Sequence, residues 1–363
     1  MISLRGVTKT FPGTATPAVD TLDLEIPRGE IVVLVGPSGC GKTTTLKMIN
    51  RVIEPTSGTI MVDGEDATAM EAHVLRRRIG YVIQQIGLFP HRTIADNIAT
   101  VPRLLGWDQD RVTERVTELI DIVGLEPEMA ERYPAALSGG QQQRVGVARA
   151  LAADPPVLLM DEPFGAVDPI VRGRLQQELL DLQAELRKTI VFVTHDIDEA
   201  ISLGDRVAIL NVGGHLEQFA EPIELLREPA NEFVAAFLGS DRGIKQLSLL
   251  PLNRVDLSGG PVVGSGSPIA DAQRLMAELG VGWIAVLEGD RLLGWLPDQE
   301  LAGADTVPAV GLRPFRSRVD VTANLREALD AVITGNTEYA AVFDHDRFVG
   351  MLSADTVSEE MRR

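Results

Sequence analysis

Residues 31–43 read IVVLVGPSGCGKT, and this segment is the strongest indication of the fold class. Its first five residues, Ile31–Val35, are apolar and mostly β-branched, and a glycine-rich loop ends the run. Such a short, wholly apolar run is typical of a strand that is buried on both faces in a parallel sheet. The loop satisfies the pattern G-x-x-x-x-G-K-[ST], and a helix is expected to follow at Thr43. The stretch therefore predicts a strand, a phosphate-binding loop and a helix in immediate succession.

The residue types of this loop suit the binding of a phosphate chain. Glycines let the backbone turn its N–H groups toward phosphate oxygens, and the start of the helix adds a favourable dipole. Lys42 can reach the β and γ phosphates, and the hydroxyl of Thr43 can bind Mg²⁺. A glycine turn without a ligand is the alternative, and the strand–loop–helix setting argues against it. Cys40 fills an unrestricted position, so we expect no chemistry there beyond alkylation of a thiol exposed beside a helix N-terminus.

The rest of the first part of the chain alternates between strand-like and helix-like sequence. Three further apolar runs of the same kind lie at 157–160, 189–193 and 207–210. Alternation of this sort predicts an α/β fold. Between about residues 89 and 156 the strand runs stop, and Arg111–Val123 has the helical spacing of apolar residues. We predict a helical insert over 89–156 within an α/β domain of residues 1–240.

The composition argues against several classes of protein. The chain of 363 residues carries 34 Lys and Arg against 52 Asp and Glu, a net charge of −18, whereas a nucleic-acid binder needs a concentrated basic face. No stretch approaches the ~20 consecutive apolar residues that a membrane-spanning helix requires. Residues 1–11 show no secretory signal, and a single cysteine excludes an internal disulfide. We therefore expect a cytosolic protein of two domains with no nucleic-acid partner.

The texture of the sequence changes after residue 240. The stretch SLLPLNRVDLSGGPVVGSGSP is rich in Gly, Pro and Ser and has no sustained periodicity, which predicts a linker over residues 241–262. Residues 263–363 are then expected to form a second domain.

An internal repeat lies in this second domain. The stretch WIAVLEGDRLLGWLPDQEL from Trp283 aligns without gaps with YAAVFDHDRFVGMLSADTV from Tyr339. The two copies span about 263–301 and 318–357. Each copy predicts a helix, a strand, a tight acidic turn, a second strand and a short helix. We expect the two copies to pack as one pseudo-symmetric α+β unit.

Asp161 and Glu162 follow one of the apolar runs directly. One carboxylate at such a strand end can hold Mg²⁺ through water, and the second can orient or deprotonate an attacking water. A solvated or capping carboxylate is the alternative, because buried strands often end in acidic residues. The order of motifs decides between them: LSGGQQQR at 137–144 precedes the acidic strand, and His195 follows the next strand.

In this order, the motifs make residues 1–240 resemble the nucleotide-binding domain of an ABC transporter. The resemblance implies an ABC ATPase fold, which is a P-loop NTPase core with a helical subdomain, and hydrolysis of ATP with Mg²⁺. It implies ATP binding by Phe11, Gly36, Ser38, Gly39, Cys40, Gly41, Lys42, Thr43 and Thr44. It implies catalytic roles for Gln84, Glu162 and His195, and Mg²⁺ binding by Thr43, Gln84 and Asp161. It implies a D-loop at Asp168 and a signature at Ser138, Gly139, Gly140 and Gln141.

Three of these assignments need the family pattern to decide them. Gln84 rather than Gln85 is the Q-loop residue, because the family pattern is Tyr-Val-x-Gln. A Phe near a strand is more often a core residue, but Phe11 occupies the position that stacks on adenine in the family. A lone His is more often a satisfied loop residue, but the place of His195 in the ordered set favours a γ-phosphate contact.

The resemblance also implies partners. In ABC subunits the signature closes over ATP held by the other protomer, so each dimer has two composite sites and one chain carries half of each. We expect a homodimer, or a dimer with a similar ATPase subunit. We also expect transmembrane permease subunits, an extracytoplasmic substrate-binding protein that acts indirectly, and a position on the inner face of the cell membrane through the permease.

The cargo is indicated by resemblance alone. IGYVIQQIGLFPH at 79–91, together with the tail repeats, resembles importers of osmoprotectants such as glycine betaine, carnitine, choline or proline. An importer of another small solute is one alternative. A soluble ABC-type ATPase that acts on nucleic acid or ribosomes is another, but such proteins usually have two cassettes or coiled-coil insertions, and this chain has one cassette and no heptads or basic arms.

The tail repeats resemble paired CBS (cystathionine-β-synthase) modules, which implies a regulatory role. CBS modules that bind adenosine nucleotides commonly close with G-x-x-[TS]-x-x-D. Here the corresponding segments are GWLPDQE at 294–300 and GMLSADT at 350–356, so the ribose-binding carboxylate is missing or displaced in both. A tail that senses ionic strength or a nucleotide and a tail that only dimerises both remain open.

Overall fold

The apolar runs of the sequence form the central sheet of the protein. The computed structural model describes residues 1–83, 87–165 and 167–362. All five residues of each of three strands are buried, as expected for strands covered on both faces: β3 (Ile31–Val35), β7 (Val157–Asp161) and β8 (Thr189–Val193).

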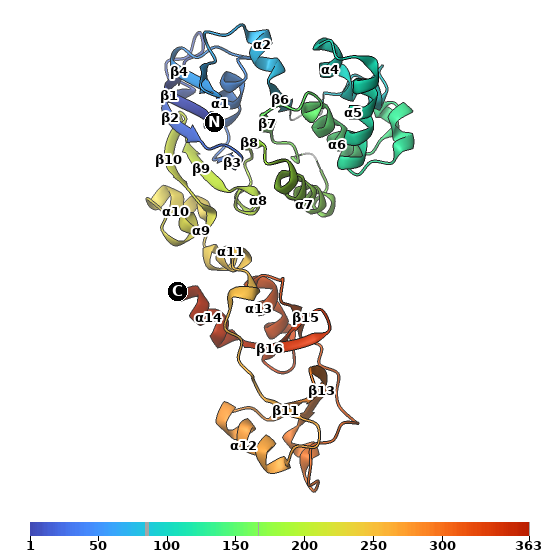
Figure 1. The fold of residues 1–363 in the computed structure, drawn as a ribbon. Coiled ribbons are helices and arrows are strands. Elements are labelled where there is room, and N and C mark those ends of the chain that lie inside the picture. The colour runs from blue at the N-terminus through green and yellow to red at the C-terminus, as the bar shows by residue number, and fades with distance from the viewer. Residues whose placement is uncertain (84–86, 166, 363) are drawn as a thin grey trace. The chain divides into compact units, whose positions relative to one another are not determined.

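The central sheet has six strands and is mainly parallel (Figure 1). Its order is β10 (His215–Ala220), β9 (Arg206–Asn211), β3, β8, β7 and β6 (Ile79–Val82). All neighbouring pairs are parallel except β9 and β10. The predicted strands at 157–160, 189–193 and 207–210 and the α/β fold are therefore confirmed. Because β3, β8 and β7 are adjacent and parallel, their carboxyl ends meet at one edge of the sheet.

A second, antiparallel sheet shares a core with the first. Its order is β2 (Val19–Ile26), β1 (Ile2–Lys9), β4 (Ser57–Val62) and β5 (Glu65–Asp66). Leu4 and Leu24 of this sheet belong to one buried cluster with Leu34 of β3 and with Leu46 of α1 (Lys42–Ile49). The helix that follows the glycine-rich loop is therefore held in place by apolar packing.

Helices fill the remainder of the first unit. None of residues 89–156, all of which the structure describes, lies in a strand. This segment holds α3 (Ile94–Ile98), α4 (Thr100–Leu104), α5 (Gln109–Ile122), α6 (Gly139–Leu151) and 3-10 turns at Pro127–Glu131 and Pro134–Ala136. The other helices are α2 (Ala72–Arg77), α7 (Pro169–Leu186), α8 (Ile197–Leu203), α9 (Pro222–Arg227) and α10 (Glu232–Leu238).

The chain divides into two compact units, Met1–Ser240 and Asp241–Arg363. The second unit holds two three-stranded sheets with the same topology. One comprises β11 (Val262–Gly264), β12 (Trp283–Glu288) and β13 (Arg291–Pro297), and the other β14 (Arg318–Asp320), β15 (Tyr339–Asp344) and β16 (Arg347–Ser353). The helical elements are α12 (Ile269–Leu279) and a 3-10 turn (Asp298–Leu301) in the first repeat, and α13 (Leu325–Thr334) and α14 (Ala354–Arg362) in the second.

The repeat read from the sequence corresponds to this duplicated structure. Val286 pairs with Gly294 in the first copy, and Val342 pairs with Gly350 in the second, each beside a register shift. The parallel strands β11 and β14 were not predicted. Each has only three residues, which is too short for a periodic pattern to show.

The predicted linker at 241–262 is wrong. The segment contains α11 (Arg242–Leu249) and a 3-10 turn (Leu252–Arg254), and Leu247 and Leu252 are buried in the core of the second unit with Leu325 of α13. The Gly- and Pro-rich composition begins only after α11, so it marks a loop inside the second unit and not its boundary.

Replacement of Leu247 by Ala is expected to destabilise the second unit by about 2–5 kcal/mol, because it leaves a cavity in a packed core. Ile244→Ala on the same helix is the matched control, since Ile244 is 51% exposed. Urea unfolding of the full chain measures both. A Leu247→Ala change no larger than that of the control would mean that α11 is a linker after all.

Candidate nucleotide site

The glycine-rich loop between β3 and α1 has a backbone that only glycine fits at two positions. A Cβ on Gly36 would lie 2.1 Å from the carbonyl oxygen of Leu210. A Cβ on Gly41, which has φ +102°, would lie 2.6 Å from the carbonyl oxygen of Ala18. Gly41 caps α1 without a side-chain hydrogen bond, so the N–H groups of the first helical turn stay available to an anion.

Lys42 lies inside the curve of this loop. Its side chain is buried, and its Nζ donates to the carbonyl oxygens of Gly36 at 2.8 Å and Pro37 at 3.1 Å. These acceptors are neutral dipoles, so a phosphate can compete for the ammonium group with the added attraction of opposite charge. Ser38 and Gly39 at the tip of the loop are exposed, and Thr44 on α1 is half-buried.

The expectation that the Cys40 thiol is exposed and open to alkylation is wrong. Its side chain is fully buried, and its Sγ would lie 2.9 Å from a Cβ on Gly36. The loop folds over the thiol, which acts as a small apolar side chain in the core of the unit. Alkylation by a reagent in solution is therefore not expected in the folded protein.

Thr43 and Asp161 meet between the loop and the end of β7. The hydroxyl of Thr43 donates to Oδ1 of Asp161 at 2.9 Å. Burial raises the pKa of the Asp161 carboxyl above its usual value, and the hydrogen bond from Thr43 opposes that rise. A hydroxyl and a carboxylate oxygen side by side are the hard ligands that Mg²⁺ prefers. Gln84, the third predicted ligand, lies outside the described residues.

The few protein ligands at this point suit a magnesium ion that binds with a nucleotide. In the described part of the chain, no group of three or more His, Cys, Asp or Glu side chains could hold a metal by itself. Mg²⁺ in phosphate-binding sites usually takes one or two protein ligands and completes its shell with phosphate oxygens and water. Thr43 and Asp161 fit that pattern.

Glu162 and His195 face each other at the same edge of the sheet. Oε1 of Glu162 lies 3.3 Å from Nδ1 of His195. Glu162 has φ +45°, a conformation that costs a non-glycine residue about 1–3 kcal/mol, and its N–H is held by the carbonyl oxygen of Val193 at 2.9 Å. The left-handed backbone of Glu162 and the histidine beside its carboxylate are the geometry on which a catalytic role would rest.

The signature residues begin helix α6. Ser138 caps the helix: its Oγ accepts from the N–H of Gln141 at 3.3 Å, and the Gln141 side chain accepts from the Ser138 N–H at 2.9 Å. Gly139 is exposed and Gly140 half-buried. The sequence SGGQ therefore builds a rigid, accessible helix N-terminus, which favours an anion.

The two remaining predicted residues are both near the surface. Asp168 caps α7, accepting from the N–H of Ile170 at 3.0 Å. Phe11 is 37% exposed, with Nζ of Lys9 5.2 Å from its ring centroid, so it is not a core residue. An exposed aromatic ring beside a cation is suited to stacking on a base. Sequence reasoning missed Glu199, a buried acid on α8 whose only signal was a charge on an otherwise apolar helix face.

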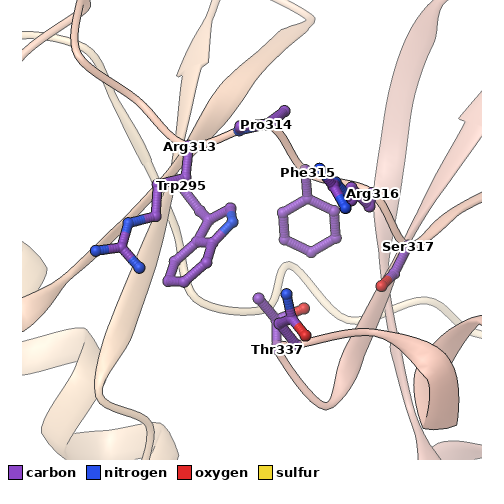
Figure 2. Close-up of a pocket in the computed structure, with 8 residues that line it drawn as sticks. Trp295, Arg313, Pro314, Phe315, Arg316, Ser317 and Thr337 are labelled. Carbon is purple, nitrogen blue, oxygen red and sulfur yellow. The ribbon is translucent and has the colours of Figure 1, made fainter.

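The second unit contains a pocket of about 310 Å³ (Figure 2). Trp295 and Phe315 face its interior, and the buried side chains of Ser317 and Thr337 line it. Glu300 ends the segment GWLPDQE at 294–300, which corresponds to the closing motif of nucleotide-binding CBS modules. Its carboxylate forms an ion pair with Arg313 at the rim of the pocket. That carboxylate is therefore already engaged by a protein cation.

The described part of the chain holds no helix with the length and apolar character needed to cross a bilayer. A family model described as ABC transporter matches residues 19–165. The chain is 48% identical to the osmoprotectant import ATP-binding protein OsmV of Salmonella typhimurium, over 99% of this chain and 96% of that protein. It is 47% identical to the glycine betaine/carnitine/choline transport ATP-binding protein OpuCA of Bacillus subtilis, over 95% of this chain and 91% of that protein.

A solved dimeric bacterial ABC transporter cassette, MJ0796, matches at 37% identity with a TM-score of 0.56, over 61% of this chain and 99% of that one. The structure of cbiO1 from Clostridium perfringens, part of the ABC transporter complex cbiONQ, matches at 27% identity with a TM-score of 0.58, over 63% of this chain and 91% of that one. The chain therefore belongs to the ABC transporter family, as an ATP-binding subunit of the ATP-hydrolysing type.

Proposed function

We propose that this chain energises an ABC importer of osmoprotectants, which are quaternary amines such as glycine betaine, carnitine or choline, or the amino acid proline. The observation that carries the proposal is the similarity to osmoprotectant import ATP-binding proteins over almost the whole chain, second unit included. A likeness confined to the cassette would support ATP hydrolysis but would say little about cargo.

The nucleotide is held at three points. Phe11 stacks on adenine, the loop N–H groups and the N-terminus of α1 hold the phosphate chain, and Lys42 turns from its carbonyl partners to the β and γ phosphates. Ser38, Gly39, Cys40 and Thr44 contribute through the backbone of the same loop and first helical turn.

Thr43, Asp161 and Gln84 would hold Mg²⁺ at this site. When bound, the ion supplies positive charge that offsets the negative charge of the transferring phosphate. Thr43 and Asp161 already lie in hydrogen-bonding contact, so little rearrangement is needed to bring both oxygens to one ion.

Glu162 orients the attacking water and accepts its proton on a carboxylate oxygen, while His195 contacts the γ-phosphate. The 3.3 Å separation of Glu162 Oε1 and His195 Nδ1 lets a protonated Nδ1 hold the carboxylate in position. Because His195 is 61% exposed, it remains reachable by the nucleotide.

Two copies of the chain close over the nucleotides. The N-terminus of α6, with Ser138 and Gly139, faces solvent and acts on ATP held by the partner, and Asp168 lies at the junction of the two copies. Transmembrane permease subunits and, indirectly, an extracytoplasmic binding protein complete the importer. The chain works on the cytoplasmic face of the membrane through the permease.

Uptake of radiolabelled glycine betaine by a strain that lacks this gene tests the proposal. Re-expression of the wild-type chain should restore uptake, and Lys42→Ala at equal abundance should not. Unlabelled carnitine, choline and proline as competitors define the cargo. Normal betaine uptake without the gene, or loss of uptake of an unrelated solute, would favour the alternative importer.

Glu162→Gln is expected to keep ATP binding and to lower kcat by ~10²–10⁴, because the amide cannot accept a proton from water. Steady-state hydrolysis and equilibrium binding of ATP measure the two effects. A kcat within about tenfold of wild type would remove Glu162 from the role of general base.

Asp161→Asn is expected to raise the thermal midpoint of the nucleotide-free protein at neutral pH while abolishing Mg²⁺-dependent hydrolysis. The raised pKa means that folding penalises the charged carboxylate, and Asn can still accept the bond from Thr43. The gain should shrink as pH falls through that raised pKa and vanish only below the ordinary pKa of Asp, where the wild-type carboxyl is neutral in the folded and the unfolded state alike. Equal thermal midpoints for the wild type and the variant at neutral pH would contradict an energetically unfavourable buried charge at Asp161.

We propose that the second unit resembles paired CBS modules and regulates uptake. Residues 1–240 form a unit of their own and hold every catalytic motif, so truncation after Ser240 should leave ATP hydrolysis intact. In proteoliposomes with the permease, full-length transporter should change its uptake rate across a salt series, and the truncated one should respond less. If the full-length and truncated transporters gave identical salt curves, and the full chain bound no adenine nucleotide outside the cassette, dimerisation would remain as the role of the second unit.

A further inference from the structure

The turn that carries His195 is held from both sides by one face of helix α7. His195 lies between β8 and α8, and its two neighbours in sequence are Thr194 and Asp196. Asp196 pairs directly with a polar side chain of α7, and Thr194 is linked to a second one through Glu199. The sequence gives no hint of this link, because the partners are separated by more than twenty residues.

Arg172 forms the first tie. Its Nη1 lies 3.7 Å from Oδ2 of Asp196, and its Nη2 donates to the carbonyl oxygen of Val167 at 3.3 Å. Asp196 in turn caps α8, accepting from the N–H groups of Asp198 at 2.9 Å and Glu199 at 3.3 Å. One guanidinium therefore spans the segment before Asp168 and the residue after His195.

Gln176 forms the second tie. Its Nε2 donates to Oε1 of Glu199 at 2.9 Å, and Glu199 also accepts a hydrogen bond from the hydroxyl of Thr194. Glu199 is only 7% exposed, and burial raises its pKa while the bonds from Thr194 and Gln176 oppose that rise. A buried acid with two donors fixes the geometry of both, since leaving it unpaired would be costly.

Arg172 and Gln176 are four residues apart, so they lie on the same face of α7. The N-terminus of that helix is capped by Asp168. The position of the Asp168 turn and the position of His195 are therefore set by the same helix.

We propose that Arg172 and Gln176 are positioning residues that hold His195 beside Glu162. The inference rests on the proposed ATPase function of this site. Each acts through the residues that flank His195. Since a misplacement of about 1 Å in a catalytic group can cost up to ~10²-fold in rate, loosening this turn should slow the chemical step without weakening ATP binding.

Arg172→Ala and Gln176→Ala test the proposal in the full-length chain. Each should lower kcat about tenfold or more and leave the KM for ATP within about twofold. Arg172→Lys keeps the charge near Asp196 but loses the fork, and it should recover part of the rate. Arg174→Ala is the matched control, because Arg174 is on the same helix, is 75% exposed and pairs with Glu178.

Double-mutant cycles separate positioning from a general loss of packing. If Arg172 acts through His195, adding Arg172→Ala to His195→Ala should change the residual rate by less than about twofold. Additive losses, an unchanged kcat in both single variants, or an equal loss in the Arg174→Ala control would overturn the inference. Should either variant fail to fold, the other and Arg172→Lys still decide it. Absence of ATP hydrolysis in the wild type would instead refute the proposed function.

Discussion

The nucleotide site depends on one constraint: β3, β8 and β7 are adjacent, parallel and buried, so the segments after them converge at one edge of the sheet. The loop with Lys42 follows β3, the turn with His195 follows β8, and Glu162 follows β7. Short polar contacts then join these segments, from Thr43 to Asp161 and from Glu162 to His195. Long loops are not needed to assemble such a site, because the topology of the sheet brings its residues together.

Three features of the site are energetically unfavourable, and the packing of the surrounding core must offset them. Asp161 is buried with a raised pKa, Glu162 occupies a left-handed conformation, and the buried ammonium of Lys42 donates to the neutral carbonyls of Gly36 and Pro37. Each of these features is unfavourable in the free protein and would serve the proposed binding of phosphates and Mg²⁺. The fully buried strands beneath the loop supply the apolar packing that makes such features tolerable.

Much of the fold and the phosphate-loop part of the site could be predicted from sequence, because buried parallel strands are continuous apolar runs and the loop has a strict pattern. The predictions that failed concern features that depend on tertiary contacts. Burial of Cys40 follows from how the loop folds over it, and α11 is a short helix whose Leu247 reveals its role only against α13. The ties from Arg172 and Gln176 to the His195 turn join side chains with no local signature. Roles that require a second chain, such as that of Ser138, come from resemblance, since spacing within one chain carries no information about a partner.

In the proposed dimer, each nucleotide is bound by the loop of one copy and the signature of the other. The most direct test mixes a Lys42→Ala chain with a Ser138→Arg chain, each inactive as a homodimer, because their heterodimer contains one intact composite site. With equal amounts and independent sites, half of the dimers are heterodimers with one working site of two, so about a quarter of wild-type ATPase activity should return. Activity that never exceeds the mean of the two separate mutants, with heterodimers verified by differential tagging, would contradict the shared site.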